Sequence, residues 1–139
     1  MKIFKQRSGK QTRAHRAGAT AVEFSLTLPI LLLFLFATYE LGIGNMMLNT
    51  TEAAAYEGAR IAIIPGATAA DAEAAAQEVL RTAGIDTYTL TVQPQNLDVA
   101  SETVEVTIDV SYAENSLFVP DFLDGIRFVR TCVLSRENQ

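Results

Sequence analysis

The amino-acid sequence predicts an α+β protein in which one long N-terminal helix crosses a membrane and continues into a small domain. Three observations support this fold class. A charge-free apolar run extends from Phe24 to Tyr39, and helical periodicity continues beyond it as far as Pro65-Gly66. After Gly84 the apolar period changes from 3.6 to 2. We therefore expect a second helix and an antiparallel sheet of about three strands.

The apolar run is long enough to cross a bilayer. Val22 to Ile43 supplies 22 residues, and a hydrocarbon core of about 30 Å needs about 20. Glu23 and Glu40 lie near its two ends, and we expect Glu40 to be solvated at the level of the lipid headgroups. A cleaved secretory signal peptide fits less well, because the apolar core runs into Thr38-Tyr39-Glu40 instead of an Ala-x-Ala site.

Charge is divided unevenly along the chain. Residues 1–18 carry six basic residues and no acid, whereas the other 121 residues carry five arginines and sixteen acids, for a net charge of −11. The six are Lys2, Lys5, Arg7, Lys10, Arg13 and Arg16. Such a run could bind nucleic acid. Beside a membrane span it is better explained as the cytoplasmic flank of the positive-inside rule, so we expect no nucleic-acid partner.

The first helix is predicted to run from about Ala19 to Ile63, a length on the order of 65 Å. Gly42 and Gly44 weaken it locally without ending it, and Pro65-Gly66 ends it. Beyond the glycines, mostly small residues recur at alternating spacings of four and three, which places them on one helical face. This stripe consists of Met47, Thr51, Ala54, Gly58 and Ile61.

A second helix is predicted to begin after Thr68, whose side chain can cap it. Asp71, three residues later, completes a pattern typical of a capping box. The carboxylate of Asp71 also suits the positive end of the helix dipole. Gly84 is a natural residue for the position just past the last turn. The alanine-rich apolar face of this helix predicts a packing element.

Three segments have the alternation of strands: 87–92, 103–110 and 127–135. The second has one apolar and one polar face, as an antiparallel sheet requires. The third has apolar residues on both faces, so we expect it to be central in the sheet or covered by a helix. The apolar loop 117–123 either covers a sheet edge or presents a contact surface for a partner.

The segment from Gly18 to Phe24 resembles the processing site of Flp-type prepilins. In that class a prepilin peptidase cuts after the glycine and leaves a glutamate fifth and an aromatic residue sixth in the mature chain. By this resemblance the cut falls between Gly18 and Ala19, and Glu23 and Phe24 occupy the fifth and sixth places.

A second motif, Ala53 to Arg60, resembles the Ala-rich Glu-Gly-Ala-Arg signature of the TadE-like pilus-assembly family. Thr131 to Glu137 is similar, more weakly, to the closing strand of that family. Tyr56 departs from the pattern, because the family often has a basic residue there. The resemblance implies a pilin-like fold and a minor pilin or pseudopilin of a tight-adherence (Flp, type IVc) pilus system. It also implies partners: other pilin and pseudopilin subunits, a prepilin peptidase, the inner-membrane assembly platform and the lipid bilayer.

With this resemblance the predicted organisation has three parts. Residues 1–18 form a basic prepilin-type leader, and residues 19–64 form the long helix, which spans the membrane over about 22–43. Residues 65–139 form a small extracytoplasmic α+β domain packed on the distal half of that helix. The predicted location is the cytoplasmic membrane, with the N-terminus inside, and the resemblance implies later incorporation into an extracellular pilus.

Glu23 is a candidate assembly residue on physical grounds also. A carboxylate just inside a membrane span costs several kcal/mol if it is ionised and unpaired. The resemblance favours pairing with the new amine of Ala19 on a neighbouring subunit; the alternative is a side chain that reaches the headgroups without a partner. For Glu57, Gly58 and Arg60 we weigh a specific assembly contact against a tight helix contact followed by a solvated charge pair.

The sequence shows no catalytic set, cofactor motif or metal site, so we expect no enzyme. His15 is the only histidine and lies in the basic segment. The lone Cys132 could pair with another chain, but we expect it to be a buried apolar residue. Three acids that could bind calcium, Asp98, Glu102 and Asp109, lack EF-hand spacing. Two function classes remain: a structural or assembly-priming pilus subunit, and a membrane-anchored extracytoplasmic binding or adhesion module outside any filament. Cleavage after Gly18 discriminates between them.

Overall fold

The computed structural model describes residues 11–97, 103–116 and 122–136, with side chains from Gly18 onward. It confirms the α+β class, with a long N-terminal helix, a second helix and a three-stranded antiparallel sheet. The chain forms two compact units, Met1–Tyr39 and Glu40–Gln139. Helix α1 (Gln11–Ala62) contributes to both. It begins eight residues before the predicted start, and neither Gly42 nor Gly44 ends it.

The described part of the first unit is helical throughout. Its side chains are exposed over most of Val22 to Phe36, and no residue in the most apolar stretch of this helix is buried by the rest of the protein. The described chain has one helix, Gly18–Ala62, that is long and apolar enough to cross a membrane. That length and composition are consistent with a single-pass membrane anchor.

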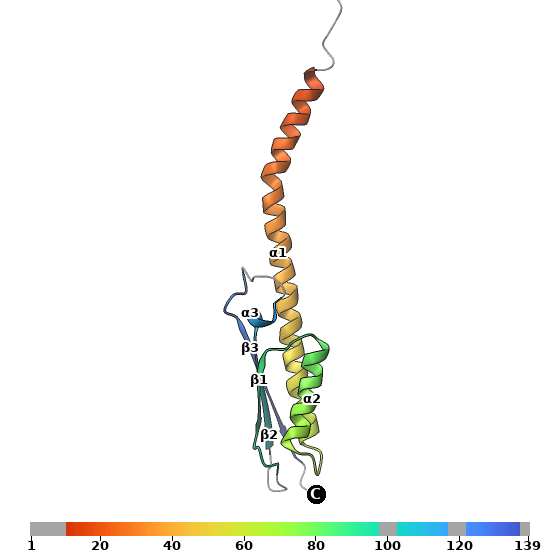
Figure 1. Ribbon diagram of the computed structural model, residues 1–139, viewed down its shortest axis with the longest axis vertical. Coiled ribbons are helices and arrows are strands. Elements are labelled where there is room, and N and C mark those ends of the chain that lie inside the picture. The colour runs from red at the N-terminus through yellow and green to blue at the C-terminus, as the bar shows by residue number, and fades with distance from the viewer. Residues whose placement is uncertain (1–10, 98–102, 117–121, 137–139) are drawn as a thin grey trace, which may run out of the picture. The chain divides into compact units, whose positions relative to one another are not determined.

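The second unit has two layers. Besides the distal part of α1 it contains α2 (Ala69–Thr82), β1 (Tyr88–Gln93), β2 (Thr103–Ser111), the short α3 (Tyr112–Asn115) and β3 (Arg127–Ser135). The strands are antiparallel in the order β1-β2-β3. In Figure 1, α2 and the distal part of α1 form one layer and the three strands form the other. The core lies between these layers.

Strand β2 provides the centre of the core. Its four inward residues are completely buried, while the residues between them are exposed or half-buried. The four are Val104, Val106, Ile108 and Val110. They alternate as the sequence predicts, because successive side chains of a strand point to opposite faces. On the opposite face, Thr107 and Thr131 lie directly across from each other and share a hydrogen bond of 2.8 Å.

Of the two positions predicted for β3, the central one is wrong, because β3 lies at the edge of the sheet and β2 is central. The other, a strand covered by a helix, is found on one face of β3. Phe128, Cys132 and Leu134 pack partly against the core beneath the helices. On the other face Val129 and Val133 are about half exposed. The apolar residues on the second face of β3 are therefore a feature of the outer surface of the sheet.

Both ends of α2 follow the predicted rules. The hydroxyl of Thr68 accepts a hydrogen bond from the amide of Asp71, and the carboxylate of Asp71 accepts one from the amide of Thr68. At the other end Gly84 has φ +74°, a left-handed conformation that glycine adopts without strain. The amides of Gly84 and Ile85 donate to the carbonyls of Arg81 and Leu80, which completes a Schellman motif.

The predicted stripe of small residues on α1 lies against the core. Met47, Thr51, Ala54 and Gly58 are buried, and Ile61 is half-buried. The hydroxyl of Thr51 donates to the carbonyl of Met47, which satisfies this polar group inside the core. Because the side chains are small, α2 and the sheet approach the backbone of α1 closely.

Candidate functional site

The segment with prepilin-like sequence lies on α1 in the first unit. Gly18, Ala19, Glu23 and Phe24 are all exposed. Among the residues whose side chains the structure describes, the Glu23 carboxylate has no hydrogen-bonding or ionic partner. A Cβ on Gly18 would meet no atom within 4 Å, so packing within the subunit does not require glycine there. The four predicted residues are thus accessible to a second molecule.

The helix surface that follows is apolar on all sides. Large exposed hydrophobic residues occupy most positions from 22 to 36 and every position from 30 to 36: Val22, Phe24, Leu26, Ile30, Leu31, Leu32, Leu33, Phe34, Leu35 and Phe36. The hydroxyl-bearing side chains here bond to the helix backbone, as Ser25 does to the carbonyl of Ala21 and Thr38 to that of Phe34. A helix that is apolar all round needs lipid or other helices about it.

The expected solvation of Glu40 by headgroups is wrong. Its side chain belongs to the second unit and is only 7% exposed. One carboxylate oxygen, Oε2, accepts hydrogen bonds from the backbone amides of Phe122 and Leu123, at 2.9 and 3.1 Å. The protein therefore provides the solvation that we assigned to the membrane surface. Of the apolar loop 117–123, the first five residues lie outside the described part of the chain.

Gly44 is a second contact at this end of the domain that the sequence analysis did not assign. A Cβ there would lie 2.7 Å from Cδ1 of Leu123 and 3.6 Å from the ring of Phe128. The ring of Phe128 also meets Tyr112 edge to face, with centroids 6.5 Å apart. The available signal was the spacing, because Glu40 and Gly44 extend the stripe toward the N-terminus by the same steps of four and three.

Glu57 and Arg60 form the charge pair of the second motif. The guanidinium donates from Nε to one carboxylate oxygen at 2.9 Å and from Nη2 to the other, with half of the Arg60 side chain exposed. Hydrogen bonding to Arg60 lowers the pKa of the Glu57 carboxyl. Tyr56 beside them is 54% exposed. These three side chains form an outward surface of α1, the motif surface.

Gly58 lies on the opposite side of the motif and is buried. A Cβ there would be 3.1 Å from the carbonyl oxygen of Ala72, 3.2 Å from Cβ of Ala76 and 3.4 Å from Val106. Of the two interpretations left open for Gly58, the structure shows the tight helix contact. Its neighbours Ala55 and Ala59 are also buried. The buried small residues of the motif thus hold the domain together, and its outward side consists of the motif surface and the exposed Ala53.

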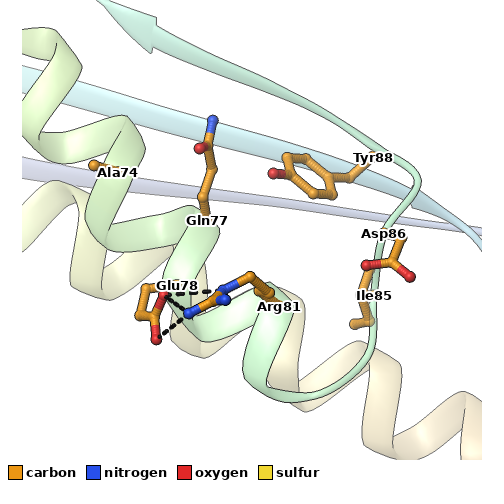
Figure 2. A pocket seen from close by; sticks show the side chains of 7 residues that line it. All are labelled: Ala74, Gln77, Glu78, Arg81, Ile85, Asp86 and Tyr88. Atoms are coloured by element: carbon orange, nitrogen blue, oxygen red, sulfur yellow. Dashed lines mark hydrogen bonds and ion pairs between the residues drawn. The ribbon is translucent and has the colours of Figure 1, made fainter.

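A hollow of about 250 Å³ lies between α2 and the start of β1. Figure 2 shows the Glu78–Arg81 ion pair along α2 and Tyr88 on the strand side. The lining consists of Ala74, Gln77, Glu78, Arg81, Ile85, Asp86 and Tyr88. Glu78 and Arg81 already neutralise each other and are largely exposed. The hollow presents no nucleophile with an adjacent base and carries no chemistry that we can assign.

The remaining predicted polar residues are placed as follows. Asp109 accepts hydrogen bonds from Nε and Nη2 of Arg127 on the neighbouring strand, and this pairing raises the pKa of the guanidinium. Asp98 and Glu102 lie outside the described residues, as do the side chain of His15 and the first ten residues of the leader 1–18. Within the described part of the chain no three His, Cys, Asp or Glu residues are grouped to hold a metal. Cys132 is half-buried, and burial raises its thiol pKa.

An exposed apolar helix of membrane-spanning length that leads into a small α+β domain is a pilin-like arrangement. Residues 18–60 match the model of the family described as TadE-like protein. The chain is therefore TadE-like over this segment, and the resemblance predicted from the two motifs is confirmed. The match begins at Gly18 and ends at Arg60, so it contains both motifs and excludes α2 and the sheet. No curated protein and no solved structure matches the chain.

Proposed function

We propose that this protein is a minor pilin or pseudopilin of a tight-adherence pilus, a structural or assembly-priming subunit that a prepilin peptidase matures between Gly18 and Ala19. Before cleavage it is held in the cytoplasmic membrane by residues 22–43, with the basic leader 1–18 inside and the α+β domain outside. Its partners are other pilin and pseudopilin subunits and the assembly platform.

The observation that carries this proposal is the uncovered apolar surface of α1 directly after Gly18. A helix with that surface can be accommodated in lipid and also among other apolar helices, so it can pass from one to the other. The match of residues 18–60 to the TadE-like family supports the same role. TadE-like proteins are not known as enzymes, which agrees with a structural subunit.

Glu23 has a defined task in this proposal. Cleavage would create an amine at Ala19, four residues before a carboxylate that has no partner among the described side chains. Within a row of subunits, that amine can neutralise the Glu23 of a neighbour, which removes the cost of a charge in an apolar environment. Gly18 and Ala19 would then act first, as the cleavage site of the peptidase, and Glu23 would act afterwards, in the filament.

The test is the N-terminus of the protein made together with its cognate prepilin peptidase. We expect mass spectrometry and N-terminal sequencing to show a chain beginning at Ala19. Gly18→Val should block cleavage, because it alters the scissile site without meeting any atom of the fold. Gly42→Val is the matched control, since a Cβ at Gly42 also meets open space, and it should be cleaved normally.

A chain that keeps Met1 in the presence of an active peptidase would contradict the proposal. The protein would then be a membrane-anchored binding or adhesion module, with α1 as a permanent tether. The α+β domain, which lies outside the family match, would in that case carry the function.

A further inference from the structure

The hydrogen bonds to Glu40 fix the position of Phe122 along helix α1. Side chains of an α-helix lean toward its N-terminus, so the Glu40 carboxylate reaches toward the apolar end of α1. The amide of Phe122 lies 2.9 Å from this carboxylate. Phe122 therefore lies at the level along α1 where the proposed membrane span, residues 22–43, comes to its end. Leu41, at the same level on the helix itself, is 60% exposed.

The aromatic ring of Phe122 is not used by the core. Its exposed fraction is 48%. The next residue, Leu123, instead packs against the core at Gly44. The loop thus places one apolar side chain inward and the preceding one outward. An outward aromatic residue at the end of a membrane span is typical of the lipid–water interface, where aromatic side chains collect.

We propose that Phe122 inserts into the interfacial region of the bilayer that holds α1 and gives the domain a second contact with the membrane. This inference rests on the proposed membrane insertion of α1. The occupant of the Phe122 surface is thus lipid, on the extracytoplasmic leaflet. The position of Phe122 beside Glu40, within the last residues of the proposed span, selects lipid over another protein.

The Glu40 contact makes this insertion physically possible for both partners. Irregular backbone approaches hydrocarbon only where its polar groups are satisfied by protein. Here the amides of Phe122 and Leu123 are both satisfied by the carboxylate. In turn, the Glu40 carboxylate accepts two hydrogen bonds and is buried by the domain. The surface that α1 presents to lipid can therefore stay apolar as far as Ile43. The hydrogen bonds between Glu40 and the two loop amides therefore make both the loop and the helix compatible with the lipid interface.

In the sequence the residues beside Phe122 include no basic residue, whereas Asp121 precedes it and Asp124 follows two residues later. We therefore expect an apolar contact with zwitterionic lipid that does not need anionic headgroups. This determines the vesicle for the test, which is phosphatidylcholine.

The chain contains no tryptophan, so one introduced tryptophan reports on one position. The full chain carrying Phe122→Trp is reconstituted at a low protein-to-lipid ratio into phosphatidylcholine vesicles that contain a shallow or a deep nitroxide quencher. Leu41→Trp calibrates the level of Glu40, and Phe34→Trp reports the membrane interior. Val133→Trp is the control for an exposed side chain of the domain, because Val133 is 56% exposed near the far end of β3.

We expect blue-shifted emission from Phe122→Trp and quenching by the shallow quencher about equal to that of Leu41→Trp. It should exceed the quenching of Val133→Trp by about threefold or more, as expected of an interfacial aromatic residue. Quenching of Phe122→Trp as weak as that of Val133→Trp, with Phe34→Trp quenched by the deep probe, overturns this inference and leaves the anchor intact. A blue shift without lipid quenching also overturns it, because a protein surface then covers the site. An unquenched Phe34→Trp would instead refute the membrane insertion itself.

Discussion

A Cβ atom on Gly58 would lie 3.1 Å from the backbone carbonyl oxygen of Ala72. Helices α1 and α2 meet at this point, and the nearest atoms are a backbone oxygen and the Cβ of Ala76, neither of which can rotate away. Val106 of the sheet closes the third side. The glycine of the second motif is therefore a spacing element of the domain.

This contact predicts that the same replacement, glycine by alanine, has opposite effects on the stability of the fold at Gly42 and at Gly58. Gly42→Ala meets open space and should stabilise the helix by about 0.5–1 kcal/mol, because alanine loses less backbone entropy. Gly58→Ala gains the same term but overpacks a tight contact at a cost of about 1–3 kcal/mol, so we expect a net loss of about 1 kcal/mol. Urea unfolding of the full chain in detergent, followed by the near-ultraviolet signal of the tyrosines, measures both. Equal stabilities would show that α2 moves aside freely.

Replacement of Glu40 should loosen the loop at residues 122 and 123. Glu40→Ala leaves two amides at a mostly buried site without this acceptor, which costs about 1–3 kcal/mol. Glu40→Gln keeps an acceptor oxygen without the charge and should lose less. Hydrogen exchange of the amides of Phe122 and Leu123 should accelerate in the alanine variant, while that of Val106 in the central strand changes little. Unchanged exchange at both loop amides would contradict the contact.

The N-cap of α2 predicts a loss of stability in acid. Hydrogen bonds from the backbone and side chain of Thr68 lower the pKa of Asp71. A carboxyl whose folded pKa is depressed contributes stability above its unfolded pKa of about 3.9 and loses it as the pH falls through the lower folded value. Thr68→Ala should cost about 1 kcal/mol at neutral pH. It should also reduce, without abolishing, the pH dependence of the unfolding midpoint below about pH 4, because the backbone amide of residue 68 still donates to Asp71. A pH profile parallel to that of the parent chain would exclude this role for Asp71.

The motif surface predicts an assembly defect without a folding defect. Arg60→Glu places two like charges side by side in an exposed part of α1, so the unfolding midpoint should barely change. Arg81→Glu is the matched control, because Arg81 forms the same i, i+3 pair with Glu78 on α2. If Glu57 and Arg60 contact another subunit, pilus counts should fall by about tenfold for the first variant and stay level for the second. Equal pilus counts for the two variants would show that Glu57 and Arg60 form a solvated ion pair on α1 without a role in assembly.

Glu23→Ala should separate assembly from insertion. Removal of a carboxylate from the apolar helix makes membrane insertion no harder. We therefore expect the variant in the membrane fraction at the parent level, with assembled pili reduced by about tenfold through the loss of the Ala19 amine partner. Glu114→Ala, an exposed carboxylate of the outer domain, is the control. Normal piliation of the Glu23 variant would leave that carboxylate without its proposed task.

The elements governed by local rules could be predicted from the sequence. The capping box at Thr68, the stop at Gly84 and the alternation of β2 each depend on residues a few positions apart, and the structure confirms all three. The apolar helix and its family resemblance follow from composition and from two short motifs. For the candidate processing residues the sequence supplies the identities, and the structure adds that they are exposed.

The errors concern contacts between distant parts of the chain. Glu40 and Phe122 are 82 residues apart, and no local pattern shows that a loop amide will replace water at a carboxylate. The edge position of β3 depends on which strand pairs with which, and an apolar outer face is equally compatible with a central strand. Gly58 was left open because a buried glycine and a glycine at a subunit contact look the same in sequence.

The narrow interface between α1 and α2 also limits how this protein can change over generations. Where alanine and glycine form the contact, nearly every amino-acid replacement adds volume, and at Gly58 the surrounding atoms leave little room for it. A saturation mutagenesis library should therefore show intolerance graded by side-chain size at Ala54, Gly58, Ala72 and Ala76. The outer face of the sheet, with Thr107, Thr131 and the two exposed valines of β3, carries no such restriction. New recognition properties can be selected there while the interior stays as it is.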